Sequence, residues 1–102
     1  MISLVEQKRD GIAEHCRRLN VRRLDVFGSA ATGTFDPEKS DLDFLVEFAK
    51  HEHLDLFDQY FDLAESLETL FGRKVDLVRN RPFKNPYFRA SVESTKESVY
   101  AS

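Results

Sequence analysis

Two aspartates stand two residues apart at the head of an apolar segment, in the stretch S-D-L-D-F-L-V. Side chains two apart on a strand point to the same face of the sheet, so the carboxylates of Asp41 and Asp43 are expected to converge. Adjacent carboxylates repel each other unless a cation lies between them. The pair therefore predicts a divalent metal site, and the alternative is a local structural role at the start of the strand.

A glycine and a serine end an earlier apolar segment, and the serine, Ser29, lies twelve residues before Asp41. Gly28 allows a tight turn and a close approach of the backbone to a phosphate. Ser29 offers a hydroxyl and a backbone N–H, both suited to phosphate oxygens. A Gly-Ser dipeptide alone is uninformative, but beside the paired aspartates it indicates metal-dependent chemistry on a nucleotide.

A third carboxylate, Asp76, lies inside the apolar stretch K-V-D-L-V. Such a position is unusual, because a buried carboxylate is costly without a partner. Displacement at a nucleotide phosphate builds charge on the phosphoryl oxygens and on the leaving group, and two Mg²⁺ ions about 4 Å apart are a common solution. We expect Asp76 to complete the metal site, although an aspartate at a sheet edge could also simply face water.

Length and composition fit one small globular domain spanning residues 1–102, with 41% apolar residues and nine phenylalanines. The formal charge of −3 argues against broad electrostatic binding to nucleic acid, so none is expected. The N-terminus lacks a long apolar signal region, and no segment approaches the roughly 18 apolar residues of a membrane span. The sequence therefore predicts a soluble, cytoplasmic protein. Its sole cysteine, Cys16, is expected to fill the core.

The pattern of apolar residues and turn formers predicts alternating helices and strands. Helices are expected over residues 3–19, 30–34, about 54–71 and from 85 onward, and strands over 21–27, 42–48 and 74–78. This order predicts an α/β (α+β) fold with a small mixed β-sheet flanked by helices. The buried face of the long helix is expected to carry Leu54, Phe57, Phe61, Ala64, Leu67 and Phe71.

Acidic residues recur along the same long helix at steps of three and four. This stripe is either an ordinary solvent-facing surface or a face that meets a basic partner protein. Its members are Asp55, Asp58, Asp62, Glu65 and Glu68.

The stretch from Val26 to Val46, with its F-G-S and S-D-L-D-F-L-V segments, resembles the signature of the polymerase-β-type nucleotidyltransferases. It is most similar to their smallest branch, the minimal nucleotidyltransferase (MNT) domain proteins. The resemblance implies a nucleotidyltransferase fold, two Mg²⁺ ions and ATP as the substrate. It also implies an antitoxin that transfers AMP to a hydroxyl, expected to be a tyrosine, of a cognate HEPN-domain toxin.

The resemblance carries functional roles over to matching positions of this sequence. Catalysis and metal binding are expected at Asp41, Asp43 and Asp76. Nucleotide binding is expected at Gly28, Ser29, Thr32, Gly33 and Ser40.

The chain departs from the family pattern at Thr32, where an arginine is often found. The change removes a fixed cation near the triphosphate, although Thr32 can still form a hydrogen bond. Arg79 or Arg81, beyond the third strand, could supply charge instead. The departure leaves a second interpretation open: a non-catalytic antitoxin that neutralises the toxin by direct binding.

Overall fold

The structure, a computed structural model of residues 1–102, describes residues 2–33, 36, 38, 41–49, 55–80 and 84–102. These ranges contain five helices and four strands, and no helix among them is long and apolar enough to cross a bilayer. In chain order the elements are α1 (Ser3–Gln7), α2 (Arg9–Arg18), β1 (Val21–Phe27), α3 (Ser29–Thr32), β2 (Leu42–Phe48), α4 (Leu56–Phe71), β3 (Val75–Arg79), α5 (Pro86–Thr95) and β4 (Glu97–Ala101).

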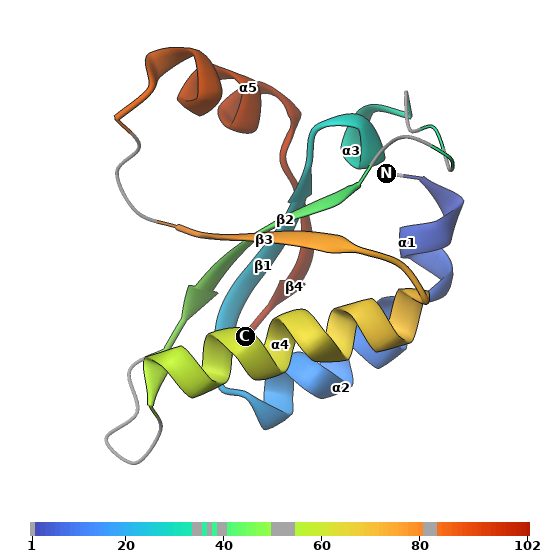
Figure 1. Ribbon diagram of the computed structural model, residues 1–102, viewed down its shortest axis with the longest axis vertical. Coiled ribbons are helices and arrows are strands. Elements are labelled where there is room, and N and C mark those ends of the chain that lie inside the picture. The colour runs from blue at the N-terminus through green and yellow to red at the C-terminus, as the bar shows by residue number, and fades with distance from the viewer. Residues whose placement is uncertain (1, 34–35, 37, 39–40, 50–54, 81–83) are drawn as a thin grey trace.

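The four strands form one sheet in the order β3-β2-β1-β4 (Figure 1). Strand β1 runs antiparallel to both of its neighbours, β2 and β4, whereas β2 and β3 run parallel. The parallel pair is joined through α4, as a crossover between parallel strands requires. The prediction of a small mixed sheet flanked by helices is therefore confirmed.

The two faces of the sheet are covered by different helices. Alternate residues of β2, such as Phe44 and Val46, point into the larger core, to which α1, α2 and α4 contribute their apolar side chains. Leu45, which lies between them, points to the opposite face and packs with Phe27 and with Val92 of α5. Helix α5 therefore covers the second face, and Figure 1 shows it apart from the α2–α4 pair.

Several predicted helix ends are confirmed by their capping geometry. The side chain of Asn85 accepts hydrogen bonds from the first N–H groups of α5, and Pro86 occupies the first turn. Gly72 ends α4 in the left-handed conformation, with φ of 66°. Asp55, a member of the acidic stripe, caps the start of α4 through the N–H of Phe57.

Two features of the chain ends were not predicted. The helix expected over residues 3–19 is two helices, because the chain turns at Lys8, whose N–H bonds to the carbonyl of Val5 three residues earlier. Strand β4 was not expected. Val99 is the buried residue of this short strand. The segment forms a strand because it pairs with the edge of β1, a long-range contact that its own sequence does not indicate.

The predicted buried face of α4 is partly wrong. Phe57 and Phe61 are 67% and 53% exposed, and their rings pack against each other with centroids 4.5 Å apart. The buried face instead carries Leu63 and Leu67, both fully buried, together with Gln59. Leu67 was correctly predicted, Ala64 and Phe71 pack at the border of the core, and residue 54 lies outside the described residues.

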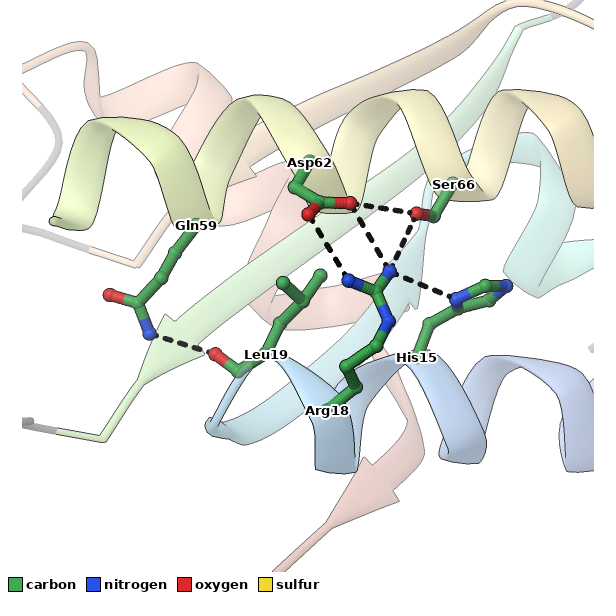
Figure 2. A network of polar contacts seen from close by, with 6 residues as sticks. All are labelled: His15, Arg18, Leu19, Gln59, Asp62 and Ser66. Carbon is green, nitrogen blue, oxygen red and sulfur yellow. Dashed lines mark hydrogen bonds and ion pairs between the residues drawn. The ribbon is translucent and has the colours of Figure 1, made fainter. Parts of the chain in front are cut away.

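The contact between α2 and α4 combines a buried hydrogen bond with an exposed ion pair (Figure 2). The buried amide of Gln59 donates to the carbonyl of Leu19, at 2.8 Å, at the end of α2. Arg18 pairs with Asp62 at 3.1 Å and also contacts Ser66 and His15. Both side chains of the ion pair are about half exposed, so water screens their attraction.

We expect the Gln59 hydrogen bond to contribute more stability than the ion pair. A Gln59→Leu substitution keeps the side-chain volume but leaves the buried Leu19 carbonyl unpaired, which should lower the free energy of unfolding by about 1–3 kcal/mol. An Arg18→Ala substitution should lower it by less than about 1 kcal/mol. Urea denaturation of both variants gives the comparison, and an equal or larger loss for Arg18→Ala would contradict this ranking.

Cys16 lies in the core formed by α1, α2 and α4 and is fully buried. Burial raises the pKa of its thiol to about 12, so the thiolate needed for reactivity is disfavoured. The prediction that this cysteine fills the core is confirmed.

Candidate active site

Asp43 and Asp76 occupy matching positions on the two parallel strands. Asp43 of β2 is the register partner of Asp76 of β3, and neighbouring strands lie about 4.8 Å apart. Each aspartate is two residues before an apolar residue of the α5-covered face, Leu45 and Val78, so both carboxylates project from that face. The fold thus brings together two carboxylates that are 33 positions apart in the sequence.

The third carboxylate belongs to Asp41, which is exposed and lies just before β2. Burial raises the pKa of Asp43 to about 6, and the negative charges of Asp76 and Asp41 add to the effect. The three carboxylates therefore act on one another electrostatically, as neighbours at one end of the β2–β3 pair. A divalent cation would relieve this crowding of like charges.

The metal-binding role itself stays a prediction. Within the described ranges, no group of three or more His, Cys, Asp or Glu side chains is arranged to hold a metal ion by itself. Mg²⁺, however, is usually held by one or two carboxylates together with water and substrate phosphates, rather than by an all-protein cage. The oxygen donors and the mutual repulsion of Asp43, Asp76 and Asp41 fit an ion that arrives with a triphosphate.

Gly28 brings the backbone against this carboxylate group. It follows Phe27, the register partner of Asp43, and adopts φ of 68° and ψ of −145°, a conformation that side chains rarely tolerate. A Cβ at this position would lie 2.9 Å from Oδ2 of Asp43. The absence of a side chain therefore permits the close approach that a phosphate-binding turn next to a metal site needs.

The remaining predicted nucleotide-binding residues follow the turn. Ser29 opens the short helix α3, in which the N–H groups of Ala31 and Thr32 donate to the carbonyl of Gly28. The hydroxyl of Thr32 donates to the carbonyl of Gly28 at 3.3 Å, so it stabilises the turn itself. Gly33 ends α3 with φ of 86°, and residue 40, the predicted Ser40, lies outside the described residues.

A lysine, rather than an arginine, is placed beside the carboxylates. Nζ of Lys74, just before β3, lies 4.0 Å from Oδ2 of Asp41. Arg79 ends β3 opposite Val46 and lines a hollow with Phe57 and other residues of α4, away from Asp76. The suggestion that Arg79 replaces the missing arginine is therefore not supported by its position, and residue 81 is outside the described ranges.

Sequence reasoning also missed Thr95, whose Oγ1 accepts a hydrogen bond of 2.9 Å from the N–H of Gly28. The two residues are 67 positions apart. Only the recognition of β4 and its antiparallel register with β1 could have indicated this contact, and neither was predicted.

The raised pKa of Asp43 predicts a pH-dependent stability. Because the folded-state pKa of about 6 exceeds the ordinary value of 3.8, folding favours the protonated form, and stability is lost as pH rises through about 6. Without divalent ions, Asp43→Asn should therefore be more stable than the wild type at pH 7. Because the carboxylate is partly exposed, we expect a gain of about 1 kcal/mol, below the roughly 3 kcal/mol of a two-unit shift.

Thermal unfolding of both proteins between pH 4 and pH 7 measures this effect. The difference should shrink as the pH falls toward 4 and approach zero well below 3.8, where Asp43 is protonated in both the folded and the unfolded state. A variant that is less stable than the wild type at pH 7 would contradict the assigned repulsion.

Residues 9–99 match the nucleotidyltransferase domain family. The chain is 38% identical over 76 residues, 74% of either chain, to MJ1379 of Methanocaldococcus jannaschii, which is provisionally named a protein adenylyltransferase. It is 40% identical over 68 residues to the protein adenylyltransferase MntA of Thermococcus cleftensis. This matched region covers 67% of this chain and 65% of MntA.

Solved structures share the fold. A provisionally assigned minimal nucleotidyltransferase, 34% identical, superposes with a TM-score of 0.72 over 94% of this chain and 95% of its own. A complex of a tri-AMPylated HEPN toxin with an MNT antitoxin, from Shewanella oneidensis, matches with a TM-score of 0.63 at 21% identity. That match covers 96% of this chain and 73% of the other.

Proposed function

Since the chain belongs to the nucleotidyltransferase domain family, we propose that this nucleotidyltransferase is an antitoxin enzyme that uses ATP and Mg²⁺ to attach AMP to a tyrosine hydroxyl of a HEPN toxin. The observation that carries the proposal is the alignment of Asp43 with Asp76 beside the Gly28 turn. The relatives named protein adenylyltransferase and the toxin–antitoxin complex with the same fold support the choice of reaction and partner.

The residues divide the reaction between them. In this proposal the lack of a side chain at Gly28 lets the phosphates approach the turn, and the hydroxyl and N–H of Ser29 bind phosphate oxygens and hold the α-phosphate near the carboxylates. Asp41 and Asp43 would hold both metal ions, and Asp76 would hold one of them. When bound, Mg²⁺ would offset the charge that develops on the α-phosphate and on the leaving pyrophosphate.

The exposed Asp76 also suits the approach of an acceptor from solvent. Its carboxylate would orient the acceptor hydroxyl and take up the proton that the hydroxyl loses. A bond forms between the acceptor oxygen and the α-phosphorus, the bond from the α-phosphorus to the bridging oxygen breaks, and pyrophosphate leaves.

The partner surface in this proposal is the exposed side of α4. Asp55, Asp62 and Glu68 of the acidic stripe already have partners in the fold. Asp58 and Glu65 are exposed and line a groove of about 770 Å³ between α2 and α4, together with Phe61. A basic surface with apolar side chains would complement this groove.

The rival function is neutralisation by binding alone, with an idle active site. Thr32 favours it, because its hydroxyl turns back to the carbonyl of Gly28 and supplies no cation for the triphosphate. The neighbouring carboxylates oppose it, because a binding module has no need of a site whose charges repel one another.

Label transfer separates the two functions. The proposal expects a reading frame for a HEPN toxin beside the gene for this chain. In the assay, that toxin is purified and mixed with the protein, MgCl₂ and ATP labelled at the α-phosphate. Label on a toxin tyrosine, identified by mass spectrometry, supports the enzyme. ATP labelled at the γ-phosphate is the control and should leave the toxin unlabelled, because that label departs with pyrophosphate. Inhibition of the toxin without label from α-labelled ATP would overturn the proposal in favour of direct binding.

A further inference from the structure

One side chain from the C-terminal part of the chain holds the turn of the candidate active site. Oγ1 of Thr95 accepts the hydrogen bond of 2.9 Å from the N–H of Gly28 and donates one of 2.7 Å to the carbonyl of Ser91, one turn back in α5. Because the hydroxyl proton is committed to Ser91, an oxygen lone pair is left to face Gly28. The orientation of the hydroxyl is thereby fixed.

The contact continues the pairing of β1 with β4. Val26 pairs with Glu97 in that antiparallel ladder, so continuing the same register by two residues places Gly28 opposite Thr95. Thr95, however, is the last residue of α5 and not part of the strand. Its side chain therefore takes the place of a backbone partner where β1 ends, and Figure 1 shows α5 leading directly into β4.

Helix α5 is itself fixed to the sheet next to this point. Phe88 packs edge to face against Phe27, the residue before Gly28, with ring centroids 6.0 Å apart. Val92 is fully buried between α5 and the sheet, where it packs with Phe27 and Leu45. Thr95 therefore lies on a helix whose position is fixed by packing against the sheet, so its hydroxyl can hold the turn in a defined position.

We propose that Thr95 is a positioning residue for the nucleotide, because its hydroxyl sets the position of the Gly28–Ser29 turn relative to the carboxylate of Asp43. The inference rests on the proposed function, in which that turn binds the phosphates of ATP. Gly28 lies close to Oδ2 of Asp43, so close that a Cβ at this position would contact that oxygen. The backbone N–H of Gly28 donates to Thr95. Loss of the hydroxyl frees the turn to shift away from the carboxylates.

Binding of MgATP to three variants tests the inference by calorimetry, without the need for an acceptor. Thr95→Val keeps the shape and removes the hydroxyl, and it should weaken binding about 3- to 10-fold, as expected for one lost hydrogen bond. Thr95→Ser keeps the hydroxyl and should bind within about twofold of the wild type. Ser94→Ala is the matched control, since Ser94 also donates to the carbonyl of Ser91, whereas the N–H of Gly28 donates to Thr95.

The outcomes separate a positioning role from a purely structural one. Weaker binding by Thr95→Val, rescue by Thr95→Ser and no change in Ser94→Ala support the inference. A Thr95→Val protein that melts at a lower temperature but binds MgATP as tightly as the wild type would overturn it and leave the proposed function intact. If the wild type itself does not bind MgATP, both the proposed nucleotide site and this inference fail.

Discussion

The Asp43→Asn variant should lose adenylyl transfer by about 10³-fold or more, because the substitution removes a proposed ligand of the metal ions that would stabilise the transition state by several kcal/mol. The side chain keeps its size, so packing between β2 and the α5-covered face is retained. The variant is also expected to be more stable than the wild type at pH 7 in the absence of metal, since the charge it removes is repelled by Asp76 and Asp41. Loss of activity together with a gain of stability cannot be attributed to unfolding. The measurement is the rate of AMP transfer to the toxin, beside a melting curve.

Glu47→Gln provides the matched control on the same strand. Glu47 lies four residues beyond Asp43 on the same face of β2, but its register partner is Arg23 rather than a carboxylate. Its neutralisation removes the same charge from the protein and should leave the transfer rate within about twofold, since surface charges far from the reaction act weakly. Full activity of the Asp41→Asn, Asp43→Asn double variant would refute the assignment of the metal site.

The carboxylate arrangement was predictable because it depends on local patterns. Asp43 and Asp76 each interrupt a short apolar run, and each run is a strand in the structure. Alternation along a strand then determines the face on which each carboxylate lies. The relative register of β2 and β3 was not in the sequence pattern, since it depends on how α4 packs across the sheet.

The buried face of α4 could not be predicted reliably from its apolar residues alone. The phenylalanines at positions 57 and 61 have the helical spacing of a core stripe, yet the helix turns Leu63 and Leu67 to the sheet. The rotation of the helix is set by tertiary contacts, among them the hydrogen bond from Gln59 to the end of α2. Two large aromatic side chains are left on the surface, a feature typical of binding faces rather than of cores.

The contact between Thr95 and Gly28 could not be predicted from the sequence for a different reason. It joins residues that lie at one end of the β1–β4 ladder but 67 positions apart in the sequence, and no pattern within either segment indicates it. The signature from Val26 to Val46 supplies the turn and two of the carboxylates, whereas the last strand and helix supply the support for the turn. Short motifs identify the groups that react, but their alignment depends on long-range packing.

Gly28→Ala should reduce AMP transfer by about 10²-fold or more, because small displacements of reacting groups have effects of that size. The added Cβ would stand 2.9 Å from Oδ2 of Asp43. The strand backbone holds Asp43 in place, so its carboxylate is the group that must turn away. The unusual conformation at Gly28 adds a cost of about 1–3 kcal/mol to the folded state. Both the transfer rate and the free energy of unfolding are therefore expected to fall.

Gly72→Ala separates these two effects. Gly72 also has a positive φ, 66° against 68°, but its ψ is 29° where that of Gly28 is −145°, and an added Cβ there would meet no described atom within 4 Å beyond its chain neighbours. This variant should lose about 1–2 kcal/mol of stability from the left-handed conformation alone and keep its transfer rate. If the two variants lost activity equally, the loss would follow from destabilisation. A selective loss in Gly28→Ala instead indicates that the reaction depends on the space between the turn and the Asp43 carboxylate, where the proposed function places the phosphates of the substrate.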